Sequence, residues 1–262
     1  MLKSLSLPPR PRTPVLSLAA TLSPRELDVV KLVALLAMLV DHINTLFLSP
    51  SRPELYALGR MAFPLFTLMW AVNLNRPGRS LQARANRCWL WAVVTQPGFT
   101  LAFYGLVPWY ALNILFVFAG VTQLLALTDR AGWRGTLAGL TIVVLLLWPL
   151  TPASYGLQGL VLALCAALYF HPARVRYRRW LTGGLCVSLL TLNGLSLLPL
   201  WPMATLLMAV LPTVMLPSCV LTAVSGHAPD GRRFMPRSFF WWVYAGHLLL
   251  LGLVRLVTGH AG

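Results

Sequence analysis

The sequence has few charged residues. Only 10% of its 262 residues are Asp, Glu, Lys or Arg, and just six of these are acidic. The length would suit one or two soluble domains, but so little charge excludes that reading. The net charge of +15 does not indicate nucleic-acid binding either, because the basic residues gather in loops between hydrophobic runs.

The common catalytic motifs are also missing. The chain contains no G-x-S-x-G, no P-loop, no paired carboxylates and no zinc-ligand spacing. Its four cysteines all fall inside hydrophobic runs, so we read them as small buried residues and predict neither disulfides nor a metal site. Any chemistry must come from isolated polar residues inside those runs.

Long hydrophobic runs dominate what is present. The chain is 58% hydrophobic, and its runs of about 20 residues match the length that crosses a hydrocarbon core. They lack the alternation of a β-barrel strand. The sequence therefore predicts an all-α, polytopic transmembrane bundle. We expect nine spans at residues 27–48, 55–74, 87–106, 110–128, 133–150, 154–170, 180–200, 203–224 and 239–257.

The distribution of positive charge predicts the orientation of this bundle. Alternate loops and the N-terminal segment carry 17 Lys and Arg residues, and the loops on the other side carry only Arg52. By the positive-inside rule the N-terminus is cytoplasmic, and nine spans then place the C-terminus in the periplasm. Residues 1–26 are predicted to be a disordered cytoplasmic tail, 27–257 the membrane domain and 258–262 a short second tail.

Three ionisable residues lie at membrane depth in the first two spans. His42 lies about 9 Å below the outer boundary and Arg60 roughly 7–8 Å below it, counting 1.5 Å per residue. Asp41 neighbours His42 in sequence but points about 100° away around the helix, so it is better placed to pair with Arg60. Ionisable groups at this depth are costly and suggest a functional site in a water-accessible cavity.

Simpler readings of these residues stay open. An Asp41–Arg60 pair could only lock two helices together, with His42 merely hydrogen-bonded. A proton relay in a transporter is the other class of function, although the sequence lacks the internal duplication of many transporters. Further polar or aromatic residues are expected in the outer half of the bundle, where interface anchoring or helix contact is the ordinary role. They are Trp109, Tyr110, Asn113, Tyr155 and His247.

At these residues the chain resembles the TraX family, the conjugal-transfer pilin acetylases. The similarity runs from about residue 27 to 251. Its most specific parts are Asp41-His42-Ile43-Asn44 and the Gly-Arg-x-Ala-Phe-Pro-Leu-Phe stretch at 59–66. Further matching segments are Asn86-Arg87-Cys88-Trp89, Pro108-Trp109-Tyr110, Asn113-Ile114-Leu115-Phe116, Ser154-Tyr155-Gly156 and Phe239-Phe240 with Tyr244 and His247.

The resemblance implies a multi-pass enzyme of the bacterial inner membrane that acetylates the N-terminal amine of a conjugative pilin subunit. Acetyl-CoA is the implied donor. Wider membrane acyltransferases to which the family looks related use an embedded histidine, which His42 would match. An accessory role in pilin maturation by cyclisation remains an alternative.

These considerations give a predicted set of site residues. The expected catalytic residues are His42 as general base, Arg60 as oxyanion donor, and Asp41 and Asn44 as supporting groups. Trp109, Tyr110, Asn113, Tyr155 and His247 are expected to contact substrate. Cationic and amide side chains of the basic loops are expected to hold the phosphates of acetyl-CoA. They are Arg84, Asn86, Arg87, Arg174 and Arg178.

Overall fold

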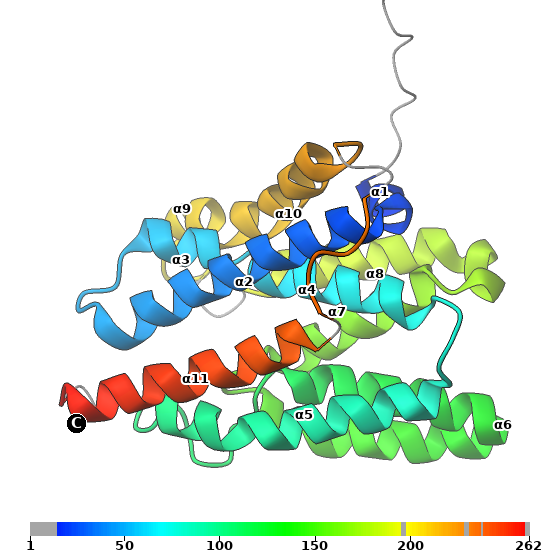
Figure 1. Ribbon diagram of the computed structural model, residues 1–262, viewed down its shortest axis with the longest axis horizontal. Helices are drawn as coiled ribbons and strands as arrows, with labels where there is room; N and C mark the ends of the chain where they lie inside the picture. Colours follow the sequence, from blue (N-terminus) through cyan, green and yellow to red (C-terminus); the bar gives the residue numbers. More distant parts are fainter. Residues whose placement is uncertain (1–14, 195–197, 228–230, 237, 260–262) are drawn as a thin grey trace, which may run out of the picture.

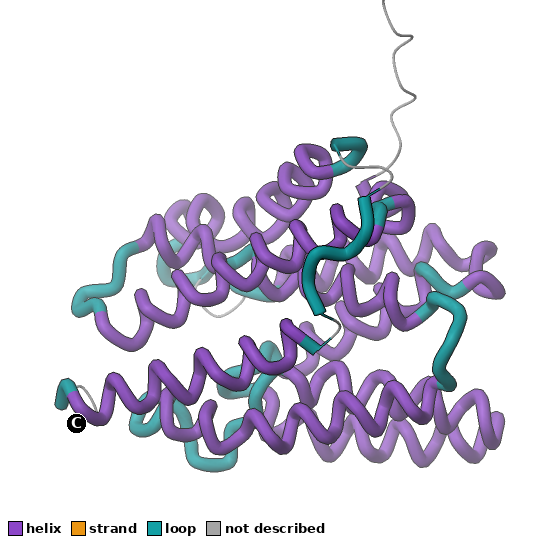
Figure 2. The backbone as a smooth tube through the Cα atoms, viewed as in Figure 1, coloured by secondary structure: helices purple, strands orange, loops and turns teal. Residues whose placement is uncertain are grey.

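The computed structural model describes residues 15–194, 198–227, 231–236 and 238–259. Within these ranges the chain forms helices and no strands, as Figure 2 shows. The predicted all-α class is therefore confirmed. The helices are α1 (Val15–Thr21), α2 (Pro24–Phe47), α3 (Pro53–Gly59), α4 (Ala62–Leu74), α5 (Leu81–Ala102), α6 (Leu115–Leu150), α7 (Gly156–Tyr169), η1 (Pro172–Tyr177), α8 (Arg178–Thr191), α9 (Pro202–Thr205), η2 (Leu206–Val210), α10 (Leu211–Val224) and α11 (Phe239–Val257).

Most helices run along the long axis of the molecule (Figure 1). On one side, α2 lies with α3 and α10. On the other side, α5 packs between α6 and α11. Helices α4 and α7 pack against each other and join the two sides, since α4 also packs on α2 and α7 also packs on α6. The space between the two sides holds the site described below.

Helix α2 begins at Pro24, three residues before the predicted start of the first span. Ser23 accepts a hydrogen bond from the backbone amide of Glu26 at 3.2 Å, and the Glu26 carboxylate accepts one from the amide of Ser23 at 2.8 Å. Pro24 occupies the first helical turn, where its missing N–H costs nothing. This reciprocal capping box satisfies two amides that the first turn would leave unpaired.

Helix α6 is a hairpin of two helical segments. The backbone leaves helical geometry at Ala131 and Gly132, where Gly132 has a φ of 55° that favours glycine. The hydroxyls of Thr128 and Thr136 then lie 3.0 Å apart. Added Cβ atoms at Gly135 and Gly139 would overlap the backbone of the first segment. These two glycines therefore allow the close packing of the two segments.

Within the described residues, five helical stretches are long and apolar enough to cross a membrane, and a bent helix pair brings the number to six if it is one span. The five are Pro24–Phe47, Pro53–Leu74, Leu115–Leu150, Pro202–Val224 and Phe239–Val257; the sixth is the pair Gly156–Tyr169 and Pro172–Thr191, bent by 116°. This supports a multi-pass membrane protein. It does not confirm nine spans, and the predicted orientation of the termini stays a prediction.

Two of the differences between the nine predicted spans and the observed helices have clear physical causes. Helix α5 is long enough to span, but Arg84, Arg87 and Gln96 make it less apolar than the five. The α6 hairpin covers most of two predicted spans, 110–128 and 133–150, as two segments that meet at Ala131 and Gly132.

The predicted disordered tail is wrong for its last residues. Residues 15–21 form α1, which packs against α4 and α10 and buries Ala19 completely. The apolar side chains of Val15, Leu18 and Leu22 follow a helical spacing that a polar, proline-containing start conceals. Residues 1–14 and 260–262 of the predicted tails lie outside the described ranges.

Candidate functional site

A cavity of about 1410 Å³ lies between the two sides of the bundle. Its lining comes from α2, α3 and α4 on one side and from α5, α6 and α11 on the other, with α7 and the segment 192–194 closing it. Along α2 the lining runs from Lys31 to Thr45. From Lys31 to His42 the helix rises by about 16 Å. One space therefore connects groups at very different depths in the bundle.

His42 lies at one end of this cavity and contacts a second histidine. Its Nδ1 is 3.0 Å from Nε2 of His247 on α11, and the two ring planes differ by only 10°. The edge of the Phe103 ring lies against His42 at 5.3 Å between centroids. The Nδ1 of His247 in turn lies 3.0 Å from the carbonyl oxygen of Val243. These contacts fix the plane of the His42 ring.

The predicted ion pair between Asp41 and Arg60 is present. Nη2 of Arg60 donates to Oδ1 of Asp41 at 2.5 Å. Nη1 donates to Asn193 at 2.8 Å, Nε donates to the carbonyl of Tyr56 at 3.2 Å, and the guanidinium lies 4.0 Å above the Tyr56 ring. Arg60 is only 8% exposed, yet it lines the cavity together with Asp41.

The backbone makes room for this pair where α3 ends. A Cβ atom on Gly59 would overlap the side chain of Asp41, so only glycine permits the close approach of α3 to α2. Arg60 follows as the first residue after the helix. The side-chain amide of Asn193 donates to the hydroxyl of Thr213 at 2.7 Å. Thr213 lies in the first turn of α10, which follows the π-helical turn η2. Groups from four parts of the chain thus orient one guanidinium.

Tyr155 lines the same end of the cavity and carries backbone strain. It adopts a left-handed conformation with φ of 63°, and its ring stacks on Phe63 at 4.8 Å between centroids. Non-glycine residues rarely adopt this conformation, and it concentrates at functional sites. The expected place of Tyr155 in the site is consistent with this geometry.

The other end of the cavity is strongly basic. Lys31 of α2 lies 5.3 Å from the centre of the Phe240 ring, and Arg87 of α5 lies 5.6 Å from that of Trp241. Burial and the nearby Arg233 lower the pKa of Arg76, which follows α4. Like charges crowded in this way favour binding of an anion. The cationic residues that line this end are Lys31, Arg76, Arg79, Arg84, Arg87 and Arg233.

Arg84 has a distinct role at this end. Its Nη1, Nη2 and Nε donate to the carbonyl oxygens of Asn73, Arg76 and Arg79 at 2.6, 2.7 and 3.0 Å. One guanidinium therefore shapes the whole turn between α4 and α5. We assign Arg84 to holding Arg76 and Arg79 in place as well as to the lining itself.

Several predicted substrate-binding residues do not line the cavity. Trp109 is 86% exposed and contacts Tyr110, which stacks on Trp148 at 4.0 Å. Asn113 is fully buried and bonds to Ala92 and Gln96. It ties the start of α6 to α5, because its Oδ1 also accepts from the amide of Leu115. These three residues belong to the frame around the site.

Asn44, predicted to support catalysis, does not line the cavity either. Its side chain donates to the carbonyl of Arg52 at 3.0 Å and accepts from the amide of Arg52 at 2.7 Å. It is 1% exposed and closes the loop between α2 and α3. The spacing that placed it one turn beyond Asp41 could not reveal this local use of both its groups.

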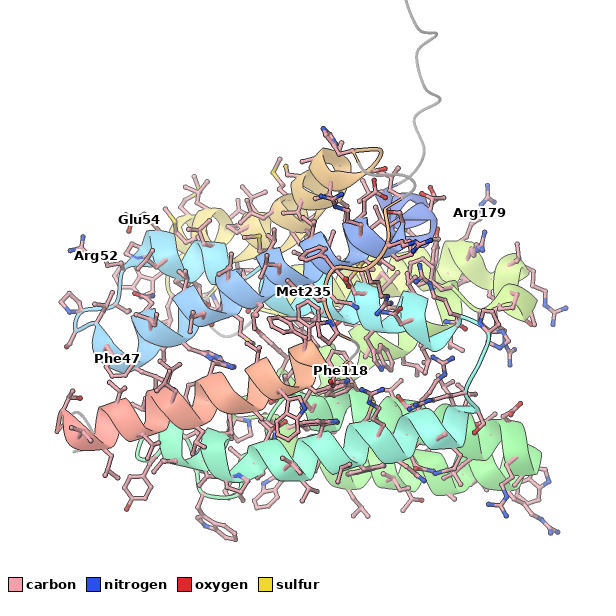
Figure 3. All side chains as sticks on the ribbon, viewed as in Figure 1. Phe47, Arg52, Glu54, Phe118, Arg179 and Met235 are labelled. Atoms are coloured by element: carbon pink, nitrogen blue, oxygen red, sulfur yellow. The ribbon has the colours of Figure 1, made fainter. Side chains whose placement is uncertain are left out.

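Three predicted acetyl-CoA ligands lie outside the cavity as well. Asn86 is exposed on α5 and accepts from Gln82 at 2.8 Å. Arg174 and Arg178 are exposed, and Arg178 lies over the Tyr169 ring. Figure 3 shows the neighbouring Arg179 at one end of the molecule, with Arg52 and Glu54 at the other. The positions of the arginines in the sequence do not distinguish those that line the cavity from those on the surface.

Other lining residues were missed by the sequence reasoning. The cavity is also lined by residues that the sequence does not single out for the site, namely Lys31, Tyr56, Arg79, Asn193 and Arg233. The lysine inside the first hydrophobic run was the one available signal. Among the described residues, no group of three or more His, Cys, Asp or Glu is placed to hold a metal ion.

Long apolar helices around an internal cavity that buried ionisable residues line are typical of a multi-pass membrane protein. The family model for the TraX protein matches residues 26–255. Two proteins called Protein TraX, from Escherichia coli and from its strain K12, are 36% and 38% identical over 236 residues, covering 89% of each chain. The chain therefore belongs to the TraX family. No solved structure matches it.

Proposed function

We propose that this protein is a membrane-embedded N-acetyltransferase that moves the acetyl group of acetyl-CoA to the N-terminal amine of a conjugative pilin subunit. The observation that carries the proposal is the single cavity with His42, Asp41, Arg60 and Tyr155 at one end and six cationic residues at the other. Acetyl-CoA has polyanionic phosphates at one end and a thioester at the other, and this distribution matches the cavity.

The basic end of the cavity supports our placement of the nucleotide part of acetyl-CoA. Guanidinium groups bind phosphate oxygens through planar pairs of N–H donors. Arg79, Arg87 and Arg233 would hold the phosphates, and the pantetheine arm would run past Phe118 and Phe66 toward His42. Phe118 lies in the interior between the two sides of the bundle (Figure 3). We place this end on the cytoplasmic side of the inner membrane, as the positive-inside rule predicts.

The His42 end of the cavity supports the acetyl-transfer step. His42 takes a proton from the pilin amine as the amine nitrogen attacks the thioester carbonyl, a step that contributes about 10²–10⁴-fold. Arg60, held by Asp41 and Asn193, donates to the oxygen that becomes negative, and Tyr155 lines the same end of the cavity. The C–S bond then breaks, and the CoA sulfur takes the proton from His42.

Intact-mass measurement of the cognate pilin, produced with and without this protein, tests the proposal. A mass increase of one acetyl group that depends on this protein supports the acetyltransferase. Loss of one water would instead indicate a role in cyclisation. An unchanged pilin mass in the presence of active protein and acetyl-CoA contradicts the proposal, and solute or proton flux in proteoliposomes then tests the transporter.

Two routes for the acetyl group remain distinguishable by experiment. In direct transfer the amine attacks acetyl-CoA, and in a two-step route the acetyl group first rests on His42. Incubation with radioactive acetyl-CoA in the absence of pilin separates them, because only the two-step route leaves label on the protein. We favour direct transfer, since the cavity places His42 and the oxyanion donor Arg60 at the same end.

A further inference from the structure

We infer that His247 is a positioning residue that fixes the tautomer of His42, so that Nε2 of His42 is the basic nitrogen. The contact geometry of the two rings carries this inference. The catalytic meaning of the tautomer rests on the proposed function, but the tautomer itself does not.

The positions of the ring hydrogens follow from the backbone carbonyl that His247 contacts. The carbonyl oxygen of Val243 can only accept, so Nδ1 of His247 carries the hydrogen in their 3.0 Å contact. In a neutral imidazole the other nitrogen then has a lone pair and accepts. Nε2 of His247 is that nitrogen, and it lies 3.0 Å from Nδ1 of His42. Nδ1 of His42 must therefore be the donor, which leaves the lone pair on Nε2.

The opposite assignment needs a charged ring. If Nε2 of His247 donated, His247 would be an imidazolium with both nitrogens protonated. The carboxylate of Asp41, which lines the cavity near His42, is already bonded to Arg60. A second cation inside an apolar bundle would be unpaired and costly. The neutral pair is the favoured state.

The arrangement also explains how His42 would support a proton in transit. When the pilin amine forms its bond to the thioester carbon, its proton moves to Nε2 of His42. The resulting imidazolium keeps its Nδ1–H donated to His247, which spreads the positive charge without a further proton transfer. The proton then leaves Nε2 for the sulfur as the C–S bond breaks, so each atom and each charge is accounted for.

Nitrogen NMR of histidine-labelled protein tests the tautomer without any activity measurement. The signals of His42 are assigned by their loss in His42→Gln, with His171→Gln as a control at the exposed start of η1. We expect Nδ1 of His42 to be protonated and Nε2 to be unprotonated in the unaltered protein. A protonated Nε2 with an unprotonated Nδ1 would overturn the inference.

Kinetics of two variants test the positioning role. His247→Leu removes the acceptor, and we expect kcat to fall by roughly 10²–10⁴-fold, the scale seen when a group that holds a histidine tautomer is lost. The KM values for acetyl-CoA and pilin should not change, because His247 was predicted to contact substrate but is not among the lining residues of the cavity. In His247→Gln the amide oxygen can still accept, so most of the lost kcat should return.

Each outcome has a definite meaning. Full kcat in His247→Leu, or a kcat in His247→Gln as low as in His247→Leu with both variants folded, would overturn the positioning role. If the NMR result is as expected but the unaltered protein never acetylates pilin, the proposed function fails and the tautomer assignment stands. If acetylation occurs with the opposite tautomer, only this inference fails.

Discussion

The two ends of the cavity are built in different ways. At the His42 end, each polar group is held by a partner from another part of the chain: His42 by His247, and Arg60 by Asp41 and Asn193. At the basic end, cations from α2, two loops and α5 gather, and among the described lining residues Asp41 at the far end is the only carboxylate. The first arrangement fixes geometry and suits a reaction. The second concentrates charge and suits binding of an anion.

Loss of the base gives the largest expected effect. We expect His42→Ala to lower kcat for pilin acetylation by about 10²–10⁴-fold, because the proton of the amine loses its acceptor. The KM for acetyl-CoA should stay close to its normal value, since the basic end is untouched. Initial rates by mass spectrometry, with membrane insertion checked in parallel, measure both. Normal acetylation by His42→Ala would move the active site elsewhere.

Arg60→Lys is expected to have the next largest effect on acetylation. A lysine keeps the charge but loses the planar set of donors that contacts Asp41, Asn193 and Tyr56 at once. We expect a fall in kcat of about 10²–10³-fold, the scale of one lost oxyanion donor. A variant with normal kcat would leave Arg60 as a lock between helices only, the simpler reading that the sequence left open.

A change far from both ends should affect stability alone. Gly139→Ala places a methyl group against the backbone of Leu124 in the α6 hairpin, and overpacking of this kind costs about 1–3 kcal/mol. Gly183→Ala on α8 is the matched control, because a Cβ there meets nothing within 4 Å. Thermal unfolding in detergent compares them. Equal stability of the two variants would contradict the antiparallel packing of the hairpin.

Neutralising the basic end gives the smallest of these effects. We expect Arg79→Gln combined with Arg87→Gln to raise the KM for acetyl-CoA about tenfold, the scale of a lost charged hydrogen bond, with little change in kcat. Arg84 is a poorer choice because it also holds the turn that carries Arg79.

Arg174→Gln with Arg178→Gln is the control for that measurement. These two arginines carry the same charge but lie outside the cavity. The KM of this double variant for acetyl-CoA should match that of the unaltered protein. A larger rise in KM for the control pair than for Arg79 and Arg87 would place the nucleotide on the surface instead.

The sequence predicts the His42 end of the cavity better than the basic end. Asp41, His42 and Arg60 stand out because ionisable groups are rare in apolar runs, and counting residues along two helices brings them to one depth. The Asp41–Arg60 bond confirms that count. The partner of His42 was not predictable in this way, because His247 comes from α11 and its contact depends on how distant helices pack.

The basic end shows where such reasoning stops. Arginines are common in the loops of any membrane protein, so charge alone does not distinguish Arg79 and Arg233, which line the cavity, from Arg174 and Arg178, which do not. Amides such as Asn44 and Asn113 were likewise misread. Each is used entirely by nearby backbone or side-chain groups, which only the packed structure shows.

The measurement that tests the central claim most directly is an electron cryomicroscopy map of the protein with bound CoA. The account predicts continuous density through the cavity, with the phosphates beside Arg79, Arg87 and Arg233 and the sulfur next to His42. Density for CoA confined to the outer arginines near η1, or a sulfur that stays at the basic end, would contradict it.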